Sequence, residues 1–160
     1  MNSQFKHCID KHKLIKVKDT ADLISKELSE SQSDLSSAQS SLNEKNHKWT
    51  IVQAYYSMFH ASKALIYKKG YREKSHHCLA IALKALFVDE NIMEEKYYNY
   101  FRDCMALRHD ADYGMIYSAE SSKEVVDWAK EFLKEAKKLI DGDESDVCSS
   151  NSTKKKTRTP

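Results

Sequence analysis

Apolar residues recur at helical spacing through most of the chain, and the densest pattern lies between Trp49 and Lys69. This segment contains no Gly or Pro and carries two apolar ridges with small residues between them: Trp49, Val52, Tyr56 and Phe59; Ile51, Tyr55, Met58 and Leu65; Ala54, Ala61 and Ala64. An apolar arc wider than the stripe of a surface helix must contact several neighbours. We therefore predict that 49–69 is the central helix of a bundle. Its polar residues exclude a membrane span.

A repeat of seven precedes the central helix, from Leu14 to Leu42, and predicts a helix over about 20–43 with Thr20 as its cap. Ser31 occupies a seam position of this repeat, which favours a bundle helix over a coiled coil. Gly70 follows the central helix at the position where a left-handed C-cap is expected.

Three more helices are expected after Gly70. The first covers 75–88 and is capped by Ser75; the second covers 94–111 and is rich in Tyr and Phe; the third covers 121–140 and ends at Gly142. Ser121 or Ser122 is the expected cap of the third helix. These boundaries divide the chain into an N-terminal arm (1–18), a helical domain (19–141) and a disordered tail (142–160). The arm is either a short helix or a loose segment.

Composition agrees with an all-α fold, a compact antiparallel bundle of about five helices. The 160 residues include three Gly and one Pro, too few for the turns of a strand-rich fold. The net charge of +2 does not by itself indicate a nucleic-acid partner. The first residues have no apolar segment typical of a secretory signal, so we expect a cytoplasmic protein that does not associate with membranes.

The four cysteines, at 8, 78, 104 and 148, are widely spaced and form no C-x-x-C pair. We expect reduced thiols rather than a metal or redox site, and no cofactor. His60 is expected to be a core or cleft histidine with a hydrogen-bond partner. Of His76 and His77, which follow the Ser75 cap, we expect one to pack and the other to face solvent.

Three separated segments read AYYSMFHASKALIYKKG (54–70), EKSHHCLAIALKALF (73–87) and LRHDADYG (107–114). In this order they resemble the HEPN family (higher eukaryotes and prokaryotes nucleotide-binding domains), in particular a small stand-alone prokaryotic branch with the pattern A-Y-Y-x-x-F-H-A, G, K-[ST]-H and R-x-x-A-D-Y. The resemblance covers about 20–140. It implies a helical bundle that often forms a homodimer, with nucleotide or RNA chemistry in a cleft between the subunits.

Many proteins of this family are toxins of toxin–antitoxin pairs, encoded beside a minimal nucleotidyltransferase, and the active members are metal-independent ribonucleases (endoribonucleases). Their signature is an Arg and a His separated by four to six residues. A His suits a base that works near pH 7, and an Arg suits a fixed cation beside a phosphate. The resemblance therefore makes an Arg and a His at this spacing the residues expected to be catalytic.

Two pairs have the required spacing, Arg102 with His109 and Arg72 with His77. The first lies on the fourth predicted helix, near the position of the family's active pair, and the second spans a loop. The Arg that matches R-x-x-A-D-Y is Arg108, and Tyr113 and Gly114 occupy the positions where its His is expected. We name Arg102, Arg108 and His109 as candidate catalytic residues.

Asp112 and Tyr113 are candidate binding residues. Asp112 also has a structural interpretation, an ion pair with Arg108 one helical turn earlier. Tyr113 and Tyr117 are candidates for AMP attachment, which the nucleotidyltransferase of some related pairs performs. Three functions stay open: a toxin with RNA endonuclease activity, a non-catalytic nucleotide-binding or partner-binding subunit that acts with a nucleotidyltransferase, and a helical interaction protein with no nucleic-acid role, which the family resemblance disfavours.

Overall fold

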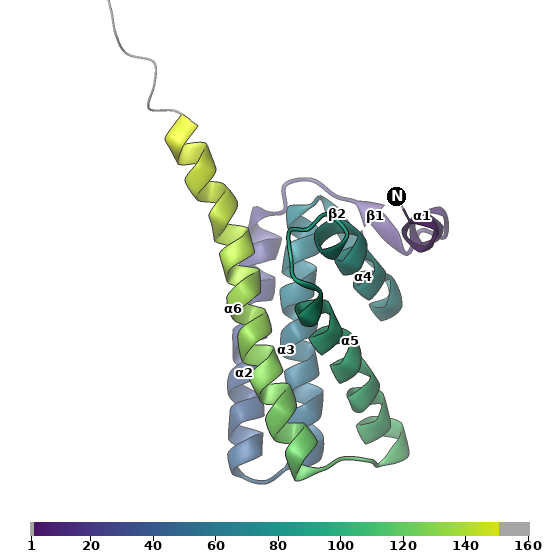
Figure 1. Ribbon diagram of the computed structural model, residues 1–160, viewed down its shortest axis with the longest axis vertical. Helices are drawn as coiled ribbons and strands as arrows, with labels where there is room; N and C mark the ends of the chain where they lie inside the picture. The colour runs from purple at the N-terminus through teal and green to yellow at the C-terminus, as the bar shows by residue number, and fades with distance from the viewer. Residues whose placement is uncertain (1, 151–160) are drawn as a thin grey trace, which may run out of the picture.

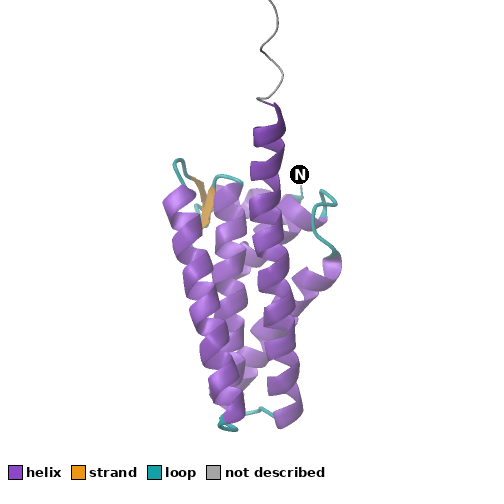
Figure 2. Ribbon diagram, turned by 90° about the vertical axis from the view of Figure 1, so that its left-hand side faces the viewer, coloured by secondary structure: helices purple, strands orange, loops and turns teal. Residues whose placement is uncertain are grey.

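The computed structural model describes residues 2–150, with side chains as far as 142, and it is an all-α bundle (Figure 1). Three long helices, α2 (Ala21–Asn43), α3 (His47–Lys68) and α6 (Ala119–Ser150), run along the long axis (Figures 1 and 2). α5 (Glu95–His109) and α4 (His76–Leu83) pack against α3. The predicted fold class is confirmed. Among the residues described, no helix is both long and apolar enough to cross a membrane.

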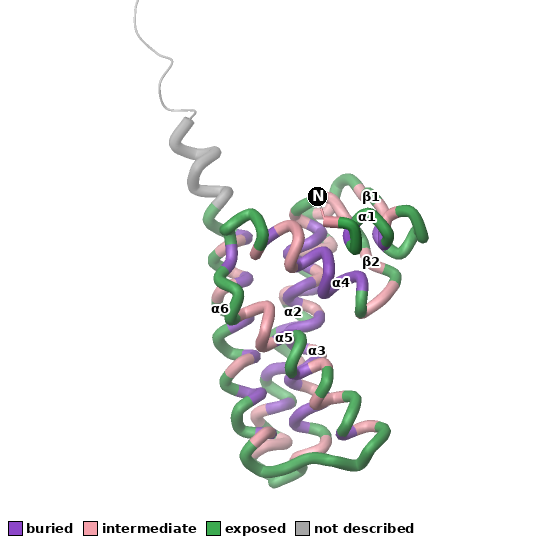
Figure 3. The backbone as a smooth tube through the Cα atoms, turned by 45° about the vertical axis from the view of Figure 1, so that its right-hand side comes forward, coloured by how far each residue is buried: buried purple, intermediate pink, exposed green. Residues whose placement is uncertain are grey.

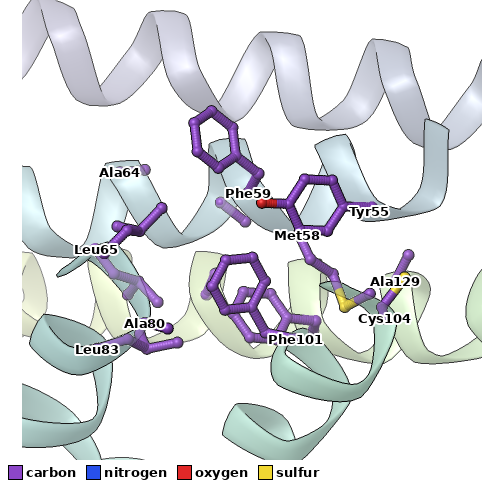
Figure 4. Close-up of a cluster of buried hydrophobic side chains, with 14 of the residues drawn as sticks. Tyr55, Met58, Phe59, Ala64, Leu65, Ala80, Leu83, Phe101, Cys104 and Ala129 are labelled. Carbon is purple, nitrogen blue, oxygen red and sulfur yellow. The ribbon is translucent and has the colours of Figure 1, made fainter. Parts of the chain in front are cut away.

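The prediction that α3 is the central helix is confirmed, because α3 contacts α2, α4, α5 and α6. Buried positions follow one another along it with few interruptions (Figure 3). In the core, the ring of Tyr55 lies parallel to that of Phe101, with ring centres 5.8 Å apart, and Met58 packs nearby (Figure 4). Trp49, at the start of the helix, differs from the expectation because its side chain is 49% exposed.

Small polar residues join α2 to α3. Ser31 Oγ donates to the Ser57 carbonyl oxygen at 2.6 Å, and Ser57 Oγ donates to the Ser31 carbonyl oxygen at 2.9 Å. Both residues are fully buried. A serine at this seam position therefore allows the two backbones to approach closely while its own hydroxyl stays hydrogen-bonded.

From residue 2 onward, the N-terminal arm packs on the bundle and is joined to it at two places. It contains α1 (Ser3–Asp10) and a strand β1 (Leu14–Lys16), which pairs antiparallel with β2 (Tyr71–Glu73). A disulfide joins Cys8 on α1 to Cys78 on α4. The expectation of reduced thiols is therefore wrong for these two residues. The two cysteines are 70 residues apart, so their spacing in the sequence does not predict the disulfide. Only the tertiary fold brings α1 onto α4.

The residues at the helix ends form the local hydrogen bonds and backbone conformations that begin or end each helix. Gly70 has φ +79°, as a left-handed cap requires, and Ser75 Oγ accepts from the Cys78 N–H, so both predicted caps are confirmed. Thr20 instead donates its hydroxyl hydrogen to the Tyr67 carbonyl oxygen. The predicted 75–88 helix is α4 followed by a π-helical turn, η1 (Lys84–Val88), and α5 is followed by a second such turn, η2 (Asp110–Gly114).

The last helix departs from the prediction at both ends. α6 begins two residues earlier than expected, and the Ser118 hydroxyl accepts from the Ser121 N–H, so Ser118 rather than Ser121 or Ser122 provides the cap. At the other end α6 continues through Gly142 to Ser150. A single glycine costs a helix about 1 kcal/mol, which is not enough to end it. The rest of the predicted tail, 151–160, lies outside the described residues.

Candidate functional site

Arg108 lies where the end of α5 meets the middle of α3. Its Nε donates to Asp112 Oδ2 at 3.1 Å, so the predicted pair within one helical turn is confirmed. Its guanidinium carbon lies 5.2 Å from the ring centre of Tyr55 and 5.8 Å from that of Tyr56, within cation–π range. The side chain is 18% exposed. The guanidinium is therefore a positioned cation that still reaches the surface.

A histidine from α4 joins the same cluster. His76 Nδ1 lies 2.6 Å from the Tyr55 hydroxyl, and the His76 ring stacks on Phe59 with ring centres 4.4 Å apart. His76 is half-buried, whereas its neighbour His77 is exposed. The prediction that one of these two histidines packs and the other faces solvent is confirmed.

The electrostatics of this cluster fix its protonation states. Burial raises the pKa of the Tyr55 hydroxyl well above its ordinary value, which keeps the proton on the oxygen. Burial, with the positive charges of Arg108 and Lys63, lowers the pKa of His76, which keeps that imidazole neutral. At neutral pH the Arg108 guanidinium therefore carries its positive charge, whereas the His76 imidazole and the Tyr55 phenol are neutral.

The other predicted site residues lie outside this cluster. Arg102 is exposed, lies 3.5 Å from Asp103 and places its guanidinium over the Tyr98 ring. His109 is exposed and its ring lies 4.9 Å from that of Tyr113. The structure therefore brings Arg108 together with Asp112, and His109 together with Tyr113, but it does not bring Arg102 into contact with either pair.

A second polar cluster extends along the same helix. His60 Nδ1 lies 2.6 Å from Glu27 Oε2, and Lys63 Nζ lies 3.1 Å from Glu27 Oε1 and 3.5 Å from Glu73 Oε1. His60 thus has the hydrogen-bond partner expected for it. Although burial raises the pKa of the Glu27 carboxyl, the hydrogen bonds from His60 and Lys63 bring it below its ordinary value. These charges compensate one another, which favours a structural role.

An apolar segment next to Arg108 is exposed. Tyr113, Met115, Ile116 and Tyr117 have between 48% and 79% of their surface exposed, although they are large apolar side chains. They belong to η2 and the connection to α6. Neighbouring apolar side chains on a surface are typical of an interaction site.

The fold and the site together define the class of protein: an all-α helical domain in which an arginine at the end of a helix lies over two tyrosine rings. A family model for the HEPN domain matches residues 24–141, and the chain therefore belongs to the HEPN family. It is 31% identical over 115 residues to a Methanocaldococcus jannaschii protein named "Putative toxin MJ0605", an alignment that covers 65% of this chain and 84% of the relative. It is also 33% identical over 82 residues to a Pyrococcus horikoshii protein named "UPF0332 protein PH1297", covering 51% and 58%.

Sequence reasoning did not place Tyr55, Tyr56 or His76 in the site. The two tyrosines follow the apolar spacing of a core helix, and that signal predicts burial rather than chemistry. His76 lies in the segment K-S-H, one of the three that carry the family resemblance. The K-S-H segment is the sequence signal that could have identified His76 as a site residue, because it places a histidine on a different helix from the one that bears Arg108.

Proposed function

We propose that this HEPN protein is the toxin-type component of a toxin–antitoxin pair and that it cleaves RNA without a metal ion. The observation that carries the proposal is the position of Arg108, which Asp112 and two tyrosine rings hold beside the surface. The relative named "Putative toxin MJ0605", of which the alignment covers 84%, supports the same class.

In this proposal Arg108 stabilises the charge that develops on the phosphate, because a fixed guanidinium needs no reorganisation during the reaction. His109 is the candidate base, since it is exposed next to Arg108 and makes no hydrogen bond among the described residues. It takes the proton from the ribose 2′-hydroxyl. The 2′-oxygen then bonds to phosphorus, the bond to the 5′-oxygen breaks, and that oxygen leaves with a proton from solvent. The products are a 2′,3′-cyclic phosphate and a 5′-hydroxyl.

Growth on expression alone tests the proposal. The protein is expected to arrest growth, and Arg108→Ala or His109→Ala is expected to restore it. Arg72→Ala, which removes an exposed arginine on β2, is the matched control and should leave the protein toxic. Harmless expression, together with no RNA cleavage by the purified protein, would rule the toxin function out.

The proposed partners are a second copy of the chain and a minimal nucleotidyltransferase that acts as the antitoxin. The exposed apolar segment 113–117 supports a protein contact beside the site. Tyr113 is the candidate acceptor of AMP from that enzyme because its side chain is 72% exposed. Light scattering on the purified protein tests the dimer, and mass spectrometry after co-expression with the neighbouring gene tests the modification.

The second candidate function is a non-catalytic, nucleotide-binding subunit of the same pair. The observation that favours it is that Arg108 already has an internal partner in Asp112, as a structural arginine has. Under this alternative the protein alone does not affect growth, and it forms a stable complex with the nucleotidyltransferase. The growth experiment therefore separates the two functions.

A further inference from the structure

His76 lies beside Arg108 without belonging to its helix. The Tyr55 ring contacts both: the Arg108 guanidinium lies 5.2 Å from its centre, and its hydroxyl lies 2.6 Å from His76 Nδ1. We propose that Arg108 and His76 together bind one phosphate group of a nucleic acid, with His76 donating a hydrogen bond through Nε2–H. This inference rests on the proposed function, from which it takes the class of ligand, a nucleic acid. It assigns to His76 the role of a hydrogen-bond donor rather than that of a base.

The hydrogen bond with Tyr55 determines which nitrogen of His76 carries the proton. The Tyr55 side chain is fully buried, and His76 Nδ1 is the hydrogen-bond acceptor that its hydroxyl meets among the described residues, since Arg108, which also hydrogen-bonds to Tyr55, can only donate. If His76 Nδ1 carried the proton, the Tyr55 hydrogen would be buried without an acceptor, which is costly. The hydroxyl therefore donates to Nδ1, and in the neutral imidazole the hydrogen lies on Nε2.

The orientation of the ring is fixed as well. Stacking on Phe59 and the bond to Tyr55 hold the imidazole at two points, so little entropy is lost when Nε2–H meets a ligand. A guanidinium and a neutral N–H donor suit a phosphate, which offers several acceptor oxygens and a negative charge. His109, whose nitrogens have no partner among the described residues, remains the group that can accept a proton.

Binding of a fluorescein-labelled oligomer of eight deoxyuridines tests the proposal. This probe has phosphates but no attacking 2′-hydroxyl, so binding is measured even if the protein cleaves no RNA. We expect His76→Ala to weaken binding about tenfold, the usual value of a hydrogen bond to a charged group. His76→Gln, whose amide nitrogen can replace Nε2–H, should recover most of the affinity, whereas His76→Asn, which reaches only the Nδ1 position, should not. His77→Ala, at the next position of α4, is the matched control and should bind like wild type.

Nitrogen-detected NMR of the histidine side chains provides a measurement that does not depend on affinity. We expect the His76 signals of the Nε2–H tautomer in the free protein, a shift of the Nε2 signal on addition of the probe, and a mixture of tautomers in Tyr55→Phe. Wild-type affinity in a folded His76→Ala variant, or an Nδ1–H tautomer in the wild type, would overturn the proposal. If these results are as expected but RNA is not cleaved, the phosphate site stands and the ribonuclease function fails.

Discussion

Replacing Tyr55 by Phe isolates one hydroxyl at the centre of the site. The change keeps the ring that stacks on Phe101 and underlies Arg108, and it removes the bond to His76 Nδ1. The lost bond contributes about 1 kcal/mol, and leaving the half-buried Nδ1 without a donor costs about 1 kcal/mol more. The expected loss in the free energy of unfolding is therefore about 2 kcal/mol, measured by urea denaturation followed by circular dichroism.

Tyr100→Phe is the matched control. It also removes one phenolic hydroxyl that bonds to a neighbouring helix, but that hydroxyl donates to Glu131 Oε2 at 3.0 Å on the surface. Surface changes of this kind usually alter the unfolding free energy by less than about 0.5 kcal/mol. Equal effects of Tyr55→Phe and Tyr100→Phe would refute the view that the Tyr55 hydroxyl holds the site together.

Three other changes test separate parts of the fold. Burial raises the pKa of Glu73, whose Oε2 has no hydrogen-bond partner among the described residues. The folded state therefore holds this proton to higher pH than the unfolded state does, so the contribution of Glu73 to stability falls as the pH rises above its ordinary pKa of about 4.5. Glu73→Gln should gain stability relative to wild type between pH 4 and pH 7 in urea titrations, and a constant difference would contradict this sign. Replacing Cys8 and Cys78 by Ser should cost about 4 kcal/mol, because the disulfide closes a long loop; equal thermal stability of wild type with and without reductant would contradict a disulfide in solution. Gly70→Ala should lower the free energy of unfolding by about 1 kcal/mol, because φ at this position is +79°. Gly142→Ala, inside α6, should instead raise the melting temperature; a stabilising Gly70→Ala with a destabilising Gly142→Ala would be inconsistent with these backbone conformations.

The sequence predicted those features of the fold that depend on local periodicity. The ranges 20–43, 49–69 and 94–111 correspond closely to α2, α3 and α5, because apolar spacing at 3.6 residues directly reports the buried face. The N-terminal arm and the disulfide could not be predicted in this way. Residues 14–16 form a strand only because β2 lies beside them, and Cys8 meets Cys78 only because α1 packs on α4.

In the candidate site, too, local contacts could be predicted from the sequence and contacts between helices could not. The pair between Arg108 and Asp112 was predictable because residues four apart share a helix face. The contact of Tyr55 with His76 was not, because these residues belong to different helices and no local pattern sets the packing of α4 on α3. Arg102 and His109 have the family's spacing, yet Arg102 lies over Tyr98 and away from the cluster. Sequence spacing therefore pointed to the helix that carries the candidate site, but not to the residues of α3 and α4 that lie against it.

The single-turnover rate of RNA cleavage by purified protein, with EDTA present and with a folded Arg108→Ala variant for comparison, tests the proposed function most directly. Wild type is expected to produce 2′,3′-cyclic phosphate ends, and Arg108→Ala to be slower by about a hundredfold, the usual effect of removing a group that stabilises developing charge. Arg108→Lys should recover only part of the rate, because Lys offers a point charge in place of a planar fork. Equal rates for wild type and Arg108→Ala, or no cleavage by wild type, would contradict the proposal.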